Sequence, residues 1–325
     1  MDPTDLDRPL DPLNSVAEAV FPSQNSTPSR RLYAISDLHL AYKENREALH
    51  SLKPHHNDSI ILCGDVGETT EHLSLAFSAY KSCFDQVWWC PGNHELYTLP
   101  TKKQGPRGEQ KYKECVEVAR QYGVLTPEDD FVKWEGEGGP AIIAPIFTLY
   151  DYSFRPDYVK LEDAVAWARE ENIEATDEVL LHPDPYPTRQ DWCSALVART
   201  DFKLTESVRQ NPDVPVIIAG HWPLRQDLAQ LFAIPRFSIW CGTKKTEDWH
   251  RRFNAKVVVS GHCHIRRTDY KDGVRFEEVS LGYPRQWEGC REKGLDINGI
   301  MREILPGPRT PVPGVDIPTL WRKYG

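Results

Sequence analysis

Five short polar motifs contain the residue types that bind metal ions or transfer protons. They read D-L-H at residues 37–39, G-D at 64–65, G-N-H-E at 92–95, G-H at 220–221 and G-H-C-H at 261–264. Carboxylate, imidazole and amide ligands suit Mn²⁺, Fe or Zn²⁺, and this set is too rich in nitrogen for Ca²⁺. D-x-H and G-D alone are weak evidence, and a lone histidine such as His221 is more often a core or surface residue. G-N-H-E and G-H-x-H are moderately specific. All five in this order, each after an apolar run, predict one metal site.

The apolar runs before these motifs have the character of buried strands. RLYAIS, SIILCG, QVWWC, VPVIIAG and KVVVSG precede the motifs, and AIIAP (141–145) and VRFEEVS (274–280) are further strand-like runs. Between strands, LEDAVAWARE and residues 190–210 are predicted helices, and a third segment has apolar residues at helical spacing: Leu73, Ala76, Phe77, Tyr80 and Phe84. Alternating strands and helices predict an α/β fold with a parallel or mixed sheet. Ligands bind at the carboxyl ends of strands in such folds, so the motifs are expected to converge.

The domain organisation follows from composition along the chain. Residues 1–30 are rich in Pro, Asp and Ser and predict a flexible N-terminal arm, and residues 305–325 form a Pro-rich, extended C-terminal tail. Residues 31–304 form the predicted catalytic domain. The segment from about 100 to 213 is long for a connection, so it is expected to add helices and a cap over one edge of the site.

Composition and charge disfavour several classes of protein. The formal net charge is −9, which disfavours nucleic-acid binding. No secretory signal is recognised at the N-terminus, and no apolar run approaches the roughly 20 residues that span a bilayer. The eight cysteines form no C-x-x-C pair, which predicts reduced thiols in a cytoplasmic protein. Cys63, Cys90 and Cys263, beside the motifs, are interpreted as small buried residues. Histidines without a surrounding motif are interpreted as surface residues: His50, His55, His56, His72, His182 and His250.

From about residue 35 to 264, the pattern D-x-H, GD, GNHE, GH and GHxH resembles the calcineurin-like metallophosphoesterases. The resemblance implies a four-layer α/β/β/α sandwich with two divalent metal ions, Mn or Fe, with Zn also possible. It implies one ion held by Asp37, His39, Asp65 and His264. It implies a second ion held by Asp65, Asn93, His221 and His262, with Asp65 bridging, since a carboxylate has two oxygens that can serve two cations. His94 is left as an imidazole beside the metals, where a general acid for the leaving oxygen belongs.

The second motif departs from the family's protein phosphatases. In GDVGETTE, Glu68 keeps an acidic position three residues after Asp65, but Thr69 stands where those enzymes carry an arginine. Glu68 could therefore orient His94, or it could cap a helix that begins near Thr69. The missing arginine weakens a protein-phosphatase reading. The purple acid phosphatase branch is also disfavoured, because no tyrosine follows the second motif at its ligand position.

Aromatic-rich stretches outside the motifs are similar to a narrower group of the family, the hydrolases that remove 4′-phosphopantetheine from carrier proteins. These stretches are LYDYSFRP (149–156), ATDEVLLHPDPYPTRQDWC (175–193), FSIWCGTKKTEDWHRRFNA (237–255) and DGVRFEEVSLGYPRQW (272–287). The resemblance implies a phosphodiesterase that acts on the serine–phosphopantetheine linkage of holo-acyl carrier protein. The alternatives are a general phosphomonoesterase or cyclic-nucleotide phosphodiesterase with the same metals, and a non-catalytic scaffold of the same fold.

An acidic carrier protein would need local positive charge on this acidic chain. Three basic pairs are predicted to form a rim that receives the carrier: Lys244 and Lys245, Arg251 and Arg252, and Arg266 and Arg267. A slot for the pantetheine arm is predicted to be lined by aromatic residues from Tyr150, Tyr152, Trp222 and Trp240.

Overall fold

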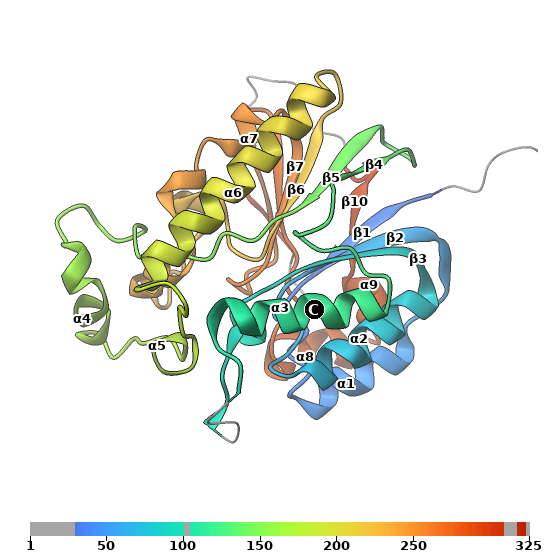
Figure 1. Ribbon diagram of the computed structural model, residues 1–325. Helices are drawn as coiled ribbons and strands as arrows, with labels where there is room; N and C mark the ends of the chain where they lie inside the picture. The colour runs from blue at the N-terminus through green and yellow to red at the C-terminus, as the bar shows by residue number, and fades with distance from the viewer. Residues whose placement is uncertain (1–29, 101–104, 309–316, 323–325) are drawn as a thin grey trace, which may run out of the picture.

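The computed structural model describes residues 30–100, 105–308 and 317–322. Within these residues the strands form two sheets that pack face to face, with helices on their outer faces (Figure 1). This is the predicted α/β/β/α sandwich. The predicted N-terminal arm, residues 1–30, lies outside the described residues except for Arg30.

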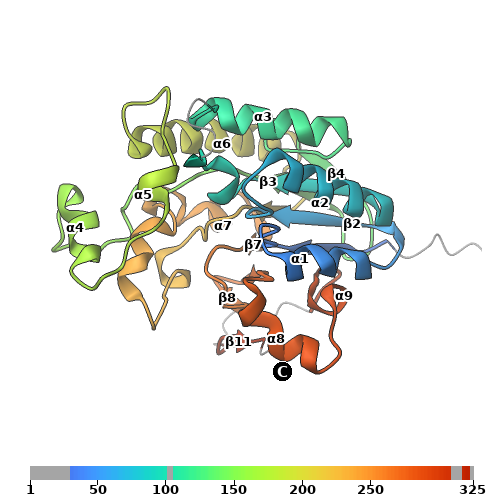
Figure 2. The same cartoon turned by 90° about the horizontal axis from the view of Figure 1, so that it is seen from below.

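The first described sheet has the strand order β10-β1-β2-β3. Strands β1 (Leu32–Ile35), β2 (His55–Cys63) and β3 (Phe84–Cys90) are parallel, and β10 (Arg302–Leu305) runs antiparallel to β1. Its outer face carries α1 (Lys43–Ala48), α2 (Thr70–Cys83) and α3 (Gly108–Gln121). On the same side lie α8 (Pro284–Glu292) and α9 (Ile297–Ile300), and Trp287 Nε1 of α8 donates to Asn45 Oδ1 of α1 at 3.0 Å (Figure 2).

The second described sheet has the order β11-β8-β9-β7-β6-β5-β4. Its parallel centre consists of β5 (Ala141–Pro145), β6 (Val216–Ala219), β7 (Ala255–Ser260) and β9 (Val274–Glu278). Antiparallel strands flank this centre: β4 (Val132–Trp134), β8 (Arg267–Lys271) and β11 (Leu320–Trp321). The long helix α6 (Arg189–Gln210) and the short α7 (Trp249–Arg252) cover the outer face, and α4 (Ala164–Arg169) and α5 (Asp177–Leu180) project at one end (Figure 1).

Alternation along the strands explains why both faces of each sheet are buried. Ile61 of β2 and Ile217 of β6 belong to the apolar cluster between the sheets, with Leu32, Ala34, Cys63, Ala219, Val257 and Val259. Their neighbours Ile60, Leu62, Ile218 and Val258 belong to the cluster beneath the helices. Side chains alternate between the two faces of a strand, so a continuous apolar run can serve both layers at once.

The predicted elements agree with the structure in most places. All seven strand-like runs contain strands, and the helical face predicted before residue 84 is buried at Leu73, Ala76, Phe77 and Tyr80. Phe84, predicted to lie on that helical face, instead begins β3, because α2 ends at Cys83. The segment of about 100–213 supplies β4 and β5 to the second sheet besides its helices, and the C-terminal tail supplies β11. The domain boundaries themselves stay predictions. No helix among the described residues is long and apolar enough to cross a membrane.

Candidate metal centre and active site

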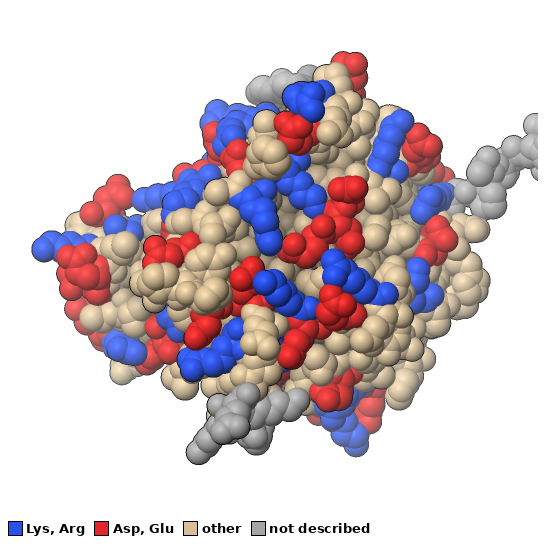
Figure 3. Space-filling view, viewed as in Figure 1, with Lys and Arg blue, Asp and Glu red and all other residues tan. Residues whose placement is uncertain are grey.

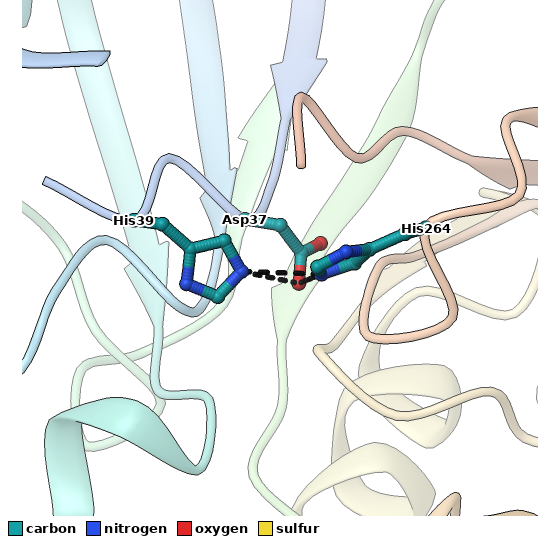
Figure 4. A group of neighbouring side chains, drawn as sticks. All are labelled: Asp37, His39 and His264. Atoms are coloured by element: carbon teal, nitrogen blue, oxygen red, sulfur yellow. Dashed lines mark hydrogen bonds and ion pairs between the residues drawn. The ribbon is translucent and has the colours of Figure 1, made fainter. Parts of the chain in front are cut away.

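The loops after β1 and β7 bring three predicted ligands together. His264 Nε2 lies 3.0 Å from Asp37 Oδ1 and 3.1 Å from His39 Nε2, and His39 Nε2 lies 3.9 Å from the same carboxylate oxygen (Figure 4). Asp37 and His39 are buried. Burial raises the pKa of Asp37, but the neighbouring His264 outweighs this effect and holds the pKa below its usual value. The carboxylate is therefore ionised and directed at two imidazole nitrogens.

The loops after β2, β3, β6 and β7 form a second cluster beside the first. His221 Nε2 lies 3.1 Å from His262 Nδ1 and 3.2 Å from Asn93 Oδ1. Asp65 lies between the clusters, with Oδ2 at 3.5 Å from His221 Nε2 and 3.8 Å from His94 Nε2. All seven predicted metal ligands therefore meet at the carboxyl ends of the strands.

The donor atoms fit bound metal ions. Three groups of described residues offer ligand atoms within 4.8 Å of one another, and each can hold an ion: Asp37, His39 and His264; Asp65, His221 and His262; and His39, Asp65 and His94. Imidazole nitrogens face each other at 3.1 Å in two pairs, His39 with His264 and His221 with His262. A cation between two such nitrogens relieves the repulsion of their lone pairs. Nitrogen and carboxylate donors of this kind suit Mn, Fe or Zn. The third group includes His94, which the sequence assigned to proton transfer instead of metal binding.

The backbone is strained where the ligands lie. Asp37, His39, Asp65, His262 and His264 all have φ between 43° and 67°, in the left-handed region that residues with a side chain rarely adopt. Such strain costs of order 1–3 kcal/mol per residue and gathers at functional sites. Two glycines make room for the carboxylates, because a Cβ atom at Gly92 would clash with Asp65 and one at Gly261 would clash with Asp37.

Three residues that sequence reasoning did not assign hold the site in position. Glu95 accepts hydrogen bonds from the backbone N–H groups of Asp65, Val66 and Gly92 at 2.7–3.0 Å, and so ties two of the loops together. Asp177 of α5 accepts from Asn93 Nδ2 at 2.9 Å, which turns Asn93 Oδ1 toward His221. Gln286 Oε1 lies 2.8 Å from His264 Nδ1, which leaves His264 Nε2 for Asp37. Glu95 belongs to the G-N-H-E motif and could have been found, whereas the other two stand in no motif.

His94 is held by a carboxylate on its far side. Glu68 Oε1 lies 3.3 Å from His94 Nδ1, so His94 Nε2 is directed toward Asp65. Burial lowers the pKa of His94, but Asp65 and Glu68 outweigh this effect and raise it to about 9. The first residue before α2 is Thr69, whose side chain accepts from His72 N at 3.3 Å, so the side-chain cap of this helix is Thr69 and not Glu68. The geometry favours the orienting role of Glu68.

A pocket of about 280 Å³ opens over the cluster of predicted metal ligands. Besides the polar residues already described, its wall includes the apolar side chains of Leu231, Ile234 and Phe237 and the polar residues Tyr283 and Arg285. Arg285 is exposed, and no ion pair with another described residue is formed by it. It is the one Lys or Arg side chain among the described residues that line this pocket.

The predicted basic rim is wrong for Arg266 and Arg267, and its other four members, although exposed, are paired with acids. Arg266 is buried and donates to the carbonyl oxygens of Ser280, Leu281 and Gln286, and Arg267 is buried beside Asp269 at 2.8 Å. The other members form ion pairs with nearby acids: Lys244 with Asp157, Lys245 with Asp151, Arg251 with Asp272, and Arg252 with Asp201. On the face in Figure 3, basic and acidic side chains alternate and do not gather by sign. The three pairs therefore do not form one continuous surface of unpaired positive charge.

The predicted aromatic slot is also wrong, because its four members lie in the core. Tyr150, Tyr152, Trp222 and Trp240 are at most 5% exposed. His250, interpreted as a surface residue, is buried, with Nε2 at 2.8 Å from Asp272 Oδ2. The interpretation of the cysteines is confirmed: all eight are free, and Cys63, Cys90 and Cys263 are buried.

A model of the calcineurin-like phosphoesterase family matches residues 30–266. The match spans most of the chain, and this protein belongs to the calcineurin-like phosphoesterases, enzymes that hydrolyse phosphoric esters. The chain is 44% identical over 280 residues to the acyl-carrier-protein phosphodiesterase PptH of Mycobacterium tuberculosis, covering 86% of this chain and 84% of that protein. The crystal structure of phosphopantetheinyl hydrolase (PptH) from the same organism matches with a TM-score of 0.80 at 42% identity, over 88% of this chain and 99% of that chain.

Proposed function

We propose that this protein hydrolyses the phosphodiester that joins 4′-phosphopantetheine to the serine of holo-acyl carrier protein. The observation that carries the proposal is the identity of 44% with an acyl-carrier-protein phosphodiesterase over 86% of the chain. The site supports it, because every polar motif of the sequence reaches one cluster with a pocket above it. The eight free cysteines support a cytoplasmic location.

In this proposal Asp37, His39, Asp65 and His264 hold one divalent ion. Asp65, Asn93, His221 and His262 hold the second, with Asp65 shared. Mn or Fe are the proposed metals, and Zn also suits the donors. When bound, two such ions polarise the phosphoryl oxygens, stabilise charge on the attacking and leaving oxygens, and lower the pKa of water.

The side chains around the ions bind and orient the substrate. A water oxygen attacks phosphorus and gives up one proton to solvent, the bond between phosphorus and the serine oxygen breaks, and the proton on His94 Nε2 passes to that serine oxygen. His94 then takes a proton back from solvent. Glu68 keeps His94 in place through Nδ1 at 3.3 Å, so Nε2 faces the pocket. Arg285 lies in the pocket wall as a cation for a non-bridging phosphate oxygen. The products are apo-carrier protein and 4′-phosphopantetheine.

The test is intact-mass analysis of holo-acyl carrier protein incubated with the Mn²⁺-loaded protein. We expect the carrier to lose the mass of phosphopantetheine and to gain a free serine. If that mass stays on the carrier while bis-(p-nitrophenyl) phosphate is cleaved readily, the carrier-protein proposal fails and a general phosphodiesterase takes its place. If neither compound is cleaved, the chain is a scaffold of this fold.

A further inference from the structure

A second and larger cavity lies next to the pocket over the metal ligands, which is called the catalytic pocket below. This cavity plays no part in the chemistry described above. Its volume is about 510 Å³, and its lining includes Gln226, Ala229, Gln230, Leu231, Phe232 and Ser238. Leu231 also lines the catalytic pocket, so the two hollows meet at this side chain. Binding sites for small organic ligands typically have volumes of about 300–1,000 Å³. The cavity is therefore large enough for an extended organic chain that begins at the metal cluster.

Two oxygen acceptors in this cavity are fixed by a single backbone carbonyl. Gln226 Nε2 donates to the Phe154 carbonyl oxygen at 2.9 Å, and Ser238 Oγ donates to the same oxygen at 3.1 Å. Because both side chains use a donor on Phe154, Gln226 Oε1 and the lone pairs of Ser238 Oγ remain as acceptors. Phe154 belongs to the stretch LYDYSFRP and Ser238 to FSIWCGTKKTEDWHRRFNA, two of the aromatic-rich stretches that supply no predicted metal ligand.

Large apolar side chains lie where the cavity meets the catalytic pocket. Leu231 lines both the cavity and the pocket over the metal ligands, and Phe232, which lines the cavity, is 79% exposed. Ile234, two residues further along, lines the catalytic pocket and is 42% exposed. Large apolar side chains left in water beside a binding site indicate a ligand that covers them.

We propose that this cavity binds the pantetheine arm of the substrate while the phosphate lies at the metal cluster, an inference that rests on the proposed function. A folded carrier protein is too large for the pocket of about 280 Å³, so it stays at the mouth and only the arm can extend further. After one methylene the arm has a carbon that carries two methyl groups, which suits Leu231 and Ile234 in the wall of the pocket over the metal ligands. It continues with two amide groups, whose N–H donors match the acceptors on Gln226 and Ser238.

The test measures equilibrium binding, so it does not depend on turnover. Calorimetry gives the affinities of the Mn²⁺-loaded protein for 4′-phosphopantetheine and for inorganic phosphate, and the readout is their ratio. We expect the wild-type protein to bind 4′-phosphopantetheine at least about tenfold more tightly than phosphate. Gln226→Leu and Ser238→Ala should each lower the ratio about fivefold, the usual effect of one lost hydrogen bond. The control is Gln110→Leu, the same exchange on the exposed side of α3, which should keep both affinities.

A wild-type ratio near one would overturn the inference, and so would an unchanged ratio in both variants. An equal loss of affinity for both ligands would also overturn it, because this would indicate damage to the phosphate site. The proposed function is judged separately by the mass of the carrier protein. Free 4′-phosphopantetheine could bind with the expected ratio of affinities while the phosphopantetheine group stays on the carrier protein. In that case the cavity inference holds and the carrier-protein function fails.

Discussion

At the scale of single residues, Asp65 is the side chain on which both halves of the site depend. Its carboxylate lies within 4.8 Å of ring nitrogens of His221 and His262, and also of His39 and His94. Asp65→Asn should therefore lose at least one metal ion and nearly all activity, because a neutral amide is a poor bridge between two cations. Elemental analysis and turnover of bis-(p-nitrophenyl) phosphate check this. Two fully occupied metals with near-normal turnover would contradict the shared-ligand assignment.

His94 has two candidate roles that one substitution separates. If His94 is a general acid, the variant His94→Ala should keep both metals and hydrolyse the substrate more slowly by a factor of roughly 10²–10⁴. The loss should be smaller for p-nitrophenyl esters, whose leaving group needs little protonation. Steady-state rates on esters with good and poor leaving groups, with metal analysis of the same sample, check the result. Loss of metal would make His94 a ligand, as its place in a group with His39 and Asp65 allows.

Glu68 should matter through His94 alone. Glu68→Gln keeps the shape of the side chain but removes the charge that lies 3.3 Å from His94 Nδ1. Turnover should fall less than in His94→Ala, and the double variant should lose little beyond His94→Ala, because residues that act as one unit are not additive. Rates of the two single variants and the double variant form the test. Fully multiplicative losses would show that Glu68 acts independently of His94.

The sequence predicted the ligands well because each belongs to a motif directly after a strand, and parallel strands end at one edge of a sheet. It could not predict Asp177 or Gln286, because each lies outside the metal-binding motifs and more than 20 positions from the ligand that it orients. It predicted Arg266 wrongly for a related reason. A pair of arginines resembles a solvated surface, and only the fold shows that carbonyl oxygens of Ser280, Leu281 and Gln286 surround one of them.

At the scale of elements, a buried carboxylate joins the loop after β5 to the loop before α7. Asp151 is 6% exposed and accepts from Thr243 Oγ1 at 2.9 Å and from Lys245 Nζ at 2.6 Å. Burial raises the pKa of Asp151, but its hydrogen bonds to Lys245, Ser153 and Thr243 outweigh this effect and lower it. The pair of Asp151 and Lys245 is therefore part of the scaffold that carries these loops.

Asp151→Asn should lower the free energy of unfolding by about 2 kcal/mol, the typical value for hydrogen bonds to a charged group. Because folding lowers the pKa of Asp151, its contribution is complete above the usual carboxyl pKa of about 3.9 and is lost as the pH falls through the lower folded value. The difference between the two proteins should therefore shrink below about pH 4. Urea denaturation at pH 7 and at pH 3.5 measures it. An equal difference at both values would exclude the charge as the cause.

At the scale of the whole molecule, the metal ligands come from both sheets. Asp37, His39, Asp65 and Asn93 follow strands of the first sheet, and His221, His262 and His264 follow strands of the second. Metal ions held between them would link the two halves of the sandwich. Ligands that bind only the folded state stabilise it, so removal of metal with a chelator should lower the melting temperature by at least about 5 °C.

Scanning calorimetry with and without chelator measures this difference, and readdition of Mn²⁺ should restore the melting temperature. Asp65→Asn serves as the matched control, because a protein that already lacks a bridging ligand should respond less to the chelator. The same melting temperature before and after chelation would contradict a metal link between the sheets.

The short strand β11 has a consequence for how copies of this protein behave toward one another. Leu320 and Trp321 pair with Thr268 and Arg267 on the outer edge of β8, and Arg322 reaches the buried carboxylate of Glu277 at 2.6 Å. An uncovered edge strand offers free N–H and C=O groups to any other strand, and this is a common route to aggregation. Leu320 and Trp321 therefore cover the edge of β8 that would otherwise be the free edge of the larger sheet. A tag or truncation that displaces them would expose this edge and promote aggregation. The metal ligands, which lie on loops after other strands, would stay in place.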